Sequence, residues 1–290
     1  MGIGSLSAEK PPAGLYILST PIGAARDVTL HVLDLLGGLD ILVAEDTRVL
    51  RKLMDIHGVA LDGRRLQSYH DHSSDADRDR ILEAIENGAS VGYASDAGTP
   101  LIADPGYSLI QGAYDRGLNV EVAPGASALT AALTLAGQPT DKVYFGGFLP
   151  AKSMARKSAL GEVATLQASL VFYESPKRLE ASLKDMIEIF GAERSITLCR
   201  ELTKKFQEVR RLSLANLLDY VSSKDSIKGE VVLVLGTPVR QQVELEDIRK
   251  ELNVLVIEKG TKEASVILSQ KYGLKRKQVY DFALSLKDDG

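Results

Sequence analysis

Three short clusters in this chain combine carboxylates with basic side chains, each directly behind an apolar run typical of a buried strand. The clusters span residues 45–48, with Glu45 and Arg48, then residues 173–178, then residues 199–205. Because the ends of neighbouring strands meet at one edge of a sheet, their recurrence predicts an ionic pocket that handles a charged substrate. Any single cluster is also compatible with a set of structural ion pairs.

Two loops rich in glycine and proline also follow apolar runs. Residues 20–23 are Thr-Pro-Ile-Gly, and residues 95–102 are Ser-Asp-Ala-Gly-Thr-Pro-Leu-Ile. Glycine permits a sharp turn and proline lacks an amide hydrogen, so the neighbouring backbone amides remain available to a ligand. Open α/β sheets bind ligands beyond the carboxyl ends of their strands, so the two loops predict one shared small-molecule site. A plain turn capped by Asp96 is the structural alternative.

A third loop of this kind, Pro-Gly-Ala-Ser-Ala at residues 124–128, leads directly into a predicted helix at residues 129–136. We expect Ser127 to cap that helix. Helix N-termini attract carboxylates and other anionic groups, so this loop is a further candidate for ligand contact.

Several familiar site patterns are absent or weak. The chain has no G-x-G-x-x-G segment behind a strand and no G-x-S-x-G elbow. Residues 146–153 resemble a phosphate-binding loop, but Ala151 replaces its second glycine, and we attribute the match to chance. His70 and His72 flank Asp71, and solvated histidines are the expected explanation; we expect no metal site.

The composition is that of an ordinary globular protein of 290 residues with a net charge of −4. Bulk charge gives no argument for nucleic-acid binding, so any RNA contact must come from local patches. The single cysteine, Cys199, excludes an intrachain disulfide framework and fits a reducing cytoplasm. No apolar run approaches the roughly 20 residues of a membrane-spanning helix, and we expect no membrane contact. The polar residues 1–13 are expected to form a loose arm.

Alternating strands and helices must position these loops. Short β-rich runs at residues 15–19, 41–44, 91–95 and 120–123 alternate with segments of helical spacing, which predicts βαβ units on a parallel sheet. The pattern breaks near residues 138–141. It restarts with predicted strands at residues 143–148, 170–173, 196–200 and 231–235, and with a clear helix at residues 177–190. We therefore expect one α/β domain at residues 14–139 and a second at residues 140–236.

Residues 237–290 are predicted to form a linker and a basic helical tail. Segments 262–272 and 275–287 have helical character and flank Gly273, as in a helix-turn-helix. Six basic and two acidic residues lie between positions 262 and 287. The second helix begins with three basic residues, Lys275, Arg276 and Lys277, at the position where helix-turn-helix proteins place cations that contact nucleic acid. Three basic residues at a helix end are equally compatible with simple solvation.

Taken in their order along the chain, these motifs resemble the ribosomal RNA small subunit methyltransferase I family. The match rests on residues 20–23, 45–48, 95–105, 139–141, 147–150, 173–179 and 200–204, and the tail is similar as well. The resemblance implies the tetrapyrrole-methylase fold, with two α/β domains and S-adenosylmethionine in a cleft between them. It further implies a homodimer that 2′-O-methylates a cytidine of 16S ribosomal RNA, as free RNA or in the small ribosomal subunit.

The resemblance also implies roles for single residues. The cofactor would contact Pro21, Ile22, Gly23, Asp96, Gly98, Thr99, Pro100, Leu101, Ile102, Ala126, Ser127, Tyr173, Arg200 and Glu230. The three charged clusters supply the other candidates. A base for the ribose hydroxyl is expected among Glu45, Glu174 and Glu201. Phosphate contacts or stabilisation of negative charge are expected from Arg48, Arg178, Arg200 and Lys204.

Two other functions stay open at this point. A methyltransferase of tetrapyrrole precursors would share the fold, but such enzymes carry a G-x-G-x-G-D first loop where this chain has Pro21 to Asp27. A non-catalytic RNA-binding or ribosome-assembly factor could also retain the fold. Affinity for S-adenosylmethionine distinguishes that factor from an enzyme.

Overall fold

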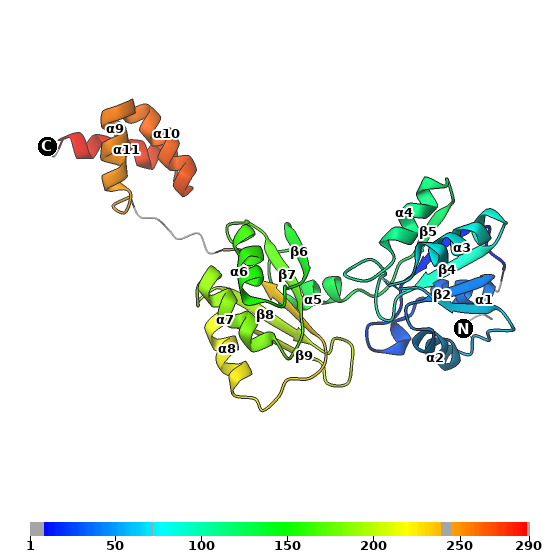
Figure 1. Ribbon diagram of the computed structural model, residues 1–290. Coiled ribbons are helices and arrows are strands. Elements are labelled where there is room, and N and C mark those ends of the chain that lie inside the picture. Colours follow the sequence, from blue (N-terminus) through cyan, green and yellow to red (C-terminus); the bar gives the residue numbers. More distant parts are fainter. Residues whose placement is uncertain (1–8, 71, 239–244, 289–290) are drawn as a thin grey trace, which may run out of the picture. The chain divides into compact units, whose positions relative to one another are not determined.

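The computed structural model describes residues 9–70, 72–238 and 245–288. Contacts divide the chain into two units, residues 1–238 and residues 239–290, whose helices and strands are labelled in Figure 1. Most of the predicted N-terminal arm lies outside the described residues, as do residues 239–244 of the predicted linker. Among the described helices, none is long and apolar enough to cross a membrane.

Five parallel strands form the first sheet, in the order β3-β2-β4-β1-β5. They are β1 (Gly14–Leu18), β2 (Ile41–Ala44), β3 (Arg65–Ser68), β4 (Ser90–Ala94) and β5 (Val120–Ala123). The predicted parallel sheet is confirmed. Strand β3 was not predicted, because the sequence Arg-Leu-Gln-Ser has no apolar run. Parallel pairing brings the C-terminal ends of all five strands to one edge.

Helices cover both faces of this sheet. On one face lie α1 (Leu30–Gly38) and α2 (Thr47–His57), and on the other lie α3 (Asp75–Glu86) and α4 (Tyr107–Asp115). The strands serve both layers because successive side chains point to opposite faces: Leu18 packs in the first layer and Ile17 in the second. Strands buried on both faces explain the continuous apolar runs in the sequence.

The second sheet is mixed, in the order β6-β7-β10-β8-β9. Its strands are β6 (Val143–Phe148), β7 (Ser169–Glu174), β8 (Ser195–Arg200), β9 (Glu208–Ser213) and β10 (Val231–Leu235). Strand β10 runs antiparallel to both β7 and β8, and its first residue, Val231, is paired with both Glu174 and Arg200. The ends of β7 and β8 therefore lie at one edge. Strand β9 was missed because its sequence is largely polar.

One face of the second sheet is covered by α6 (Ser153–Glu162), α7 (Leu179–Phe190) and α8 (Leu214–Ser222). Helix α5 (Ala128–Ala136) covers the other face, where Ala132 and Ala136 pack with Val171 and Val232. Figure 1 shows α5 beside this sheet. The sequence places this helix in the first domain, residues 14–139. Its alanine face instead allows close approach to the second sheet, so from residue 128 onward the chain packs on that sheet.

The described residues 245–288 of the C-terminal unit form three helices, α9 (Arg249–Lys259), α10 (Thr261–Tyr272) and α11 (Arg276–Asp288). They pack around Leu252, Leu268 and Val279. Gly273 ends α10 with a φ of 67° in the left-handed region, so the predicted helix-turn-helix is confirmed. Helix α9 was not predicted, since charged residues obscure its apolar stripe. The basic residues 275–277 are exposed at the start of α11.

Candidate active site

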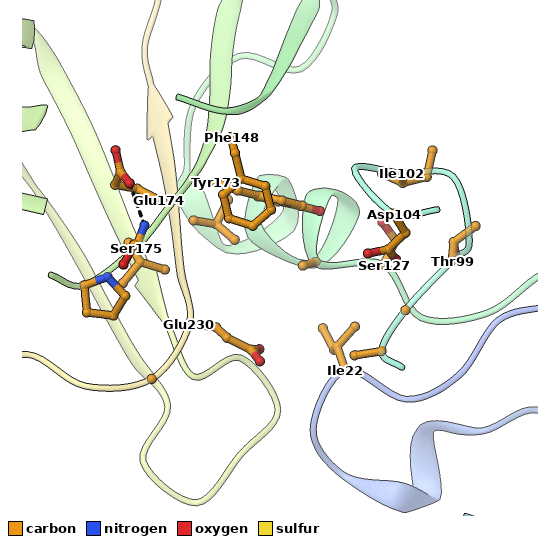
Figure 2. Close-up of a pocket in the computed structure, with 17 residues that line it drawn as sticks. Ile22, Thr99, Ile102, Asp104, Ser127, Phe148, Tyr173, Glu174, Ser175 and Glu230 are labelled. Atoms are coloured by element: carbon orange, nitrogen blue, oxygen red, sulfur yellow. Dashed lines mark hydrogen bonds between the residues drawn. The ribbon is translucent and has the colours of Figure 1, made fainter. Parts of the chain in front are cut away.

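A cavity of about 290 Å³ lies between the loops that follow β1, β4 and β5 and the adjoining ends of β7 and β10. Figure 2 shows Ile22, Thr99 and Asp104 on one side and Tyr173 and Glu230 on the other. Its wall combines apolar side chains, carboxylates and loop backbone, as is usual for small-molecule sites. The full lining consists of Ile22, Ala97, Gly98, Thr99, Ile102, Asp104, Ser127, Ala128, Phe148, Tyr173, Glu174, Ser175, Pro176, Gly229, Glu230, Val231 and Val232.

The loops after β1 and β4 are held together by their backbones. The amide of Thr20 donates to the Gly98 carbonyl at 2.9 Å, and the Gly98 amide donates back to Thr20 at 3.0 Å. Gly98 has a φ of 86°, and a Cβ atom there would lie 3.2 Å from Cγ2 of Ile22. The backbone conformation therefore favours glycine at this position, and an added Cβ would also be in tight contact with Ile22.

Further along the same loop, Leu101 and Ala103 adopt positive φ angles of 71° and 63°. Side-chain-bearing residues rarely do so, and each such conformation costs about 1–3 kcal/mol. The hydroxyl of Thr99 donates to the carbonyl of Ala126 at 3.0 Å, which ties this loop to the one after β5. Strained backbone of this kind is common in ligand-binding loops.

Ser127 immediately precedes α5, but its side chain forms no capping hydrogen bond. The expectation that it caps the helix is therefore wrong. Its backbone is extended, with φ −145° and ψ 129°, and the residue lines the cavity instead.

Tyr173 forms an aromatic wall of the cavity. Its ring packs edge-on against Phe145 and Phe148, with centroids 5.0 and 5.4 Å away. Burial raises the pKa of the Tyr173 hydroxyl to about 12, an effect opposed by the Leu129 backbone and reinforced by the charge of Asp104. The phenol thus stays protonated near neutral pH and is available as a hydrogen-bond donor.

Glu174 lines the cavity, yet its carboxylate is already engaged. It accepts hydrogen bonds from the Ser182 hydroxyl at 2.5 Å and the Ser175 amide at 2.6 Å, and it pairs with Arg178 at 2.7 Å. Its side chain has no exposed surface. These contacts join the end of β7 to the start of α7, so they favour a structural role for both members of the pair over base catalysis and phosphate contact.

Arg200 and Glu201, at the end of β8, do not line this cavity but a neighbouring one. Arg200 donates to Glu208 at 2.9 Å, and Glu201 accepts from Lys204 at 2.9 Å. The hydrogen bond from Lys204 lowers the pKa of the Glu201 carboxyl, with help from the Glu230 amide and against the effect of burial. A carboxylate with a lowered pKa is a weaker proton acceptor.

The loop after β8 also touches the loop after β1. The Ala24 amide donates to the Thr203 hydroxyl at 3.0 Å, and a Cβ atom on Gly23 would lie 2.5 Å from that oxygen and 2.7 Å from the Leu202 carbonyl. Ile22 and Leu202 share one buried cluster. The sequence predicted Gly23 as a cofactor contact, whereas the structure uses it to let these two loops meet.

The cluster after β2 lies apart from both cavities. Asp46 accepts hydrogen bonds from the side chain and backbone of Arg48, which lower the pKa of its carboxyl to about 2. The side chain of Arg48 is 89% exposed. The Asp46 amide donates to Asp96 at 2.8 Å, so Asp96 joins the loops after β2 and β4. Glu45 is half-buried at the end of β2.

Half of the predicted cofactor residues line the cavity, namely Ile22, Gly98, Thr99, Ile102, Ser127, Tyr173 and Glu230. The others lie outside its lining: Pro21, Gly23, Asp96, Pro100, Leu101, Ala126 and Arg200. Sequence reasoning missed Asp104 and Phe148 among others. Asp104 follows a recognised loop by two residues, and Phe148 ends a predicted strand, so position alone could have suggested both.

Comparison with known proteins bears on the chemistry of this cavity. Residues 14–218 match the family model for tetrapyrrole (corrin/porphyrin) methylases. The chain is 39% identical over 288 residues, covering 99% of it, to the ribosomal RNA small subunit methyltransferase I of Mesorhizobium japonicum, of which 97% is covered. For the protein of that name from Escherichia coli O157:H7, identity is 36%, with 96% and 97% covered.

The chain belongs to the ribosomal RNA small subunit methyltransferase I family. The resemblance inferred from its motifs is thereby confirmed, and the protein is a methyltransferase.

Solved structures agree on the fold of this family member. A cobalt precorrin-4 methyltransferase aligns with a TM-score of 0.58 at 17% identity, covering 77% of this chain and 94% of that one. A diphthine synthase aligns with a TM-score of 0.58 at 14% identity, covering 77% and 90%. The predicted tetrapyrrole-methylase fold is confirmed.

Proposed function

We propose that this protein transfers a methyl group from S-adenosylmethionine to the ribose 2′-oxygen of a cytidine in the RNA of the small ribosomal subunit. One observation carries the proposal: the similarity to relatives named for ribosomal RNA small subunit methylation extends over nearly the whole chain. The cavity adds support, because loops of the first sheet and strand ends of the second meet at one concave site.

The lining suits S-adenosylmethionine. Ile22, Ile102 and Val232 offer apolar contacts for an adenine ring, while Asp104 and Glu230 offer acceptors for ribose hydroxyls and an amino group. Gly98 lets the loop backbone approach a ligand without an intervening Cβ atom. When bound, this cofactor supplies an electrophilic methyl group on a positively charged sulfur. The predicted contacts outside the lining then serve to hold the loops in place.

Catalysis in this proposal depends mainly on orientation, since methyl transfer needs the acceptor oxygen aligned opposite the leaving sulfur. A base assists by removing the proton of the hydroxyl. The engaged carboxylates of Glu174 and Glu201 favour positioning roles for these residues. Glu45 lies outside the cavity lining, so the base stays open among the three predicted carboxylates. Single-turnover rates of Glu45→Gln, Glu174→Gln and Glu201→Gln with bound cofactor test this set, and full rates in all three variants exclude it.

We further propose that the protein acts in the cytoplasm as a homodimer. Edge strands of both sheets support the second point, because β5 exposes Val122 (57%) and β6 exposes Phe148 (59%) to solvent. Exposed apolar side chains on edge strands are commonly covered by a partner. Light scattering of the wild type and of Val122→Asp tests the dimer, and a wild-type mass of one chain rejects it.

The decisive experiment offers the purified protein and radiolabelled S-adenosylmethionine three acceptors: small ribosomal subunits, free 16S RNA and a tetrapyrrole precursor. The subunits and RNA come from cells that lack this activity. We expect label in the ribosomal RNA and, after digestion and mass spectrometry, on the 2′-oxygen of a cytidine. Label in the tetrapyrrole instead favours the precursor methyltransferase. Absence of both transfer and cofactor binding favours a non-catalytic RNA-binding factor.

A further inference from the structure

A second cavity lies beside the first, in the region formed by the end of β8, the start of β9, the end of α8 and the segment before β10. Its wall carries the cations Arg200, Lys224 and Lys228 and the rings of Phe206 and Tyr220. We call it the basic-aromatic pocket. Its two carboxylates, Glu201 and Glu208, are each bonded to cations of the protein itself.

Glu208 organises this pocket. Its carboxylate accepts from Arg200 at 2.9 Å and from the Tyr220 hydroxyl at 2.5 Å, and it also pairs with Arg210. Burial alone raises the pKa of Glu208, but the hydrogen bonds from Tyr220, Arg210 and Arg200 outweigh it and lower the pKa to about 2. The carboxylate thus stays charged near neutral pH and holds these groups through hydrogen bonds within the protein.

The remaining groups of the pocket face solvent. Phe206 is 66% exposed, with the Lys205 ammonium 5.5 Å from its ring centroid. Lys224 and Lys228 are exposed, and neither forms an ion pair with a carboxylate in the part of the chain that the structure describes. The Lys224 ammonium lies 4.9 Å from the centroid of the Tyr220 ring. An exposed ring beside cations that no carboxylate neutralises suits a base that stacks and a phosphate that needs a counter-charge.

The two cavities share one turn of the chain. Gly229 lines both, the preceding Lys228 lines the basic-aromatic pocket, and the following Glu230 lines the first cavity. Gly229 has a φ of 94°, and a Cβ atom there would collide with the Glu201 side chain. The basic-aromatic pocket is therefore an immediate neighbour of the first cavity.

From these observations we infer that the basic-aromatic pocket binds the single-stranded RNA segment next to the methylated nucleotide, with a base stacked on Phe206 and a phosphate held by Lys224 and Lys228. This inference rests on the proposed function and extends it. Stacking on an aromatic ring requires a base that is out of its helix, so the pocket selects single-stranded or unpaired RNA. Charge alone would equally attract an acidic peptide, which has no base to stack.

The test compares Phe206→Ala with Tyr114→Ala in the full chain. Tyr114 lies on α4 outside both cavities and is 65% exposed, which matches Phe206. Binding of a fluorescent single-stranded RNA is measured by anisotropy, and S-adenosylmethionine binding by calorimetry. We expect Phe206→Ala to weaken RNA binding about 5- to 150-fold, with Phe206→Tyr close to wild type and cofactor affinity unchanged. Tyr114→Ala is expected to bind RNA normally.

Charge is tested with Lys228→Ala against Lys184→Ala, a cation on α7 that pairs with Glu180. Loss of one phosphate contact should reduce the slope of log affinity against log salt by about 0.7. Wild-type RNA affinity in Phe206→Ala together with an unchanged slope in Lys228→Ala overturns the inference, as does equal competition by polyglutamate of matched charge. If the binding tests fail but the wild-type enzyme still methylates ribosomal RNA, the proposed function stands and only the role of the basic-aromatic pocket is rejected.

Discussion

Replacing Gly23 by alanine tests whether the contact between the loops after β1 and β8 maintains the cavity. The φ angle of Gly23 is not in the positive range, so alanine introduces no backbone strain of its own. The added Cβ would instead lie 2.5 Å from Thr203 Oγ1, 2.6 Å from Lys204 Cγ and 2.7 Å from the Leu202 carbonyl oxygen. The side-chain atoms can move, whereas the carbonyl forces the loop itself to shift.

Overpacking of this kind costs about 1–3 kcal/mol. The adjacent residue Ile22 lines the cavity and shares a buried cluster with Leu202, so separation of the loops displaces a cavity wall. If cofactor binding requires the native arrangement, this cost appears in its affinity. About 1.4 kcal/mol corresponds to a factor of ten, so the Kd for S-adenosylmethionine should rise about 5- to 150-fold.

Isothermal titration calorimetry measures this change. Gly161→Ala is the matched control, because Gly161 lies in α6 with no atom within 4 Å of an added Cβ. We expect that control to bind the cofactor normally and to be stabilised by about 0.5–1 kcal/mol, since alanine favours the helix. A wild-type Kd in Gly23→Ala would refute the reasoning, because the contact would then have no part in holding the cavity.

Three further predictions concern other parts of the chain. Folding lowers the pKa of Glu208 from 4.5 to about 2, so its contribution to stability is complete above pH 4.5 and is lost as the pH falls toward 2. In urea titrations, the difference in unfolding free energy between the wild type and Glu208→Gln should therefore shrink over that pH range. A difference that stays constant contradicts this prediction. Asp185→Asn leaves the buried Arg156 guanidinium without its carboxylate, so the free energy of unfolding should fall by about 3–5 kcal/mol. The control Glu188→Gln removes an exposed ion pair and should cost about 0–1 kcal/mol. Equal losses in the two variants would contradict the role of burial. Replacing Lys275, Arg276 and Lys277 by alanine should lower the salt slope of RNA binding by up to about 2 while cofactor affinity is kept, and an unchanged slope makes the tail structural.

Most strands could be predicted because their apolar or β-branched residues follow one another in the sequence. The apolar runs that became β1, β2, β4, β7, β8 and β10 are largely buried on both faces, and such strands are continuous in sequence. The edge strands β5 and β6 are partly exposed, but their valines and aromatic residues still favour a strand. The missed strands β3 and β9 also lie at sheet edges, and their sequences are largely polar. Their existence depends on a neighbour that pairs with them.

The candidate site divides in the same way. The loops of residues 20–23 and 95–102 were recognisable, because glycine and proline leave a local signature wherever a strand ends in a tight turn. The burial and the hydrogen-bond partners of the carboxylates could not be predicted. Glu174 looks like a reactive acid in the sequence, and it is the burial of its side chain against Ser182 and Arg178 that makes it structural.

The sequence by itself determined the fold class, the family and the order of the ligand-binding loops, since these depend on local conformation and on motifs that are read in order. The tertiary structure alone decided that α5 packs on the second sheet, that Gly23 meets Thr203 from 180 positions away, and that Gly229 joins two cavities. These facts depend on the distance between residues remote in the chain. The sequence gives the chemical type of each side chain, but its burial and its interaction partners arise only when distant segments come together.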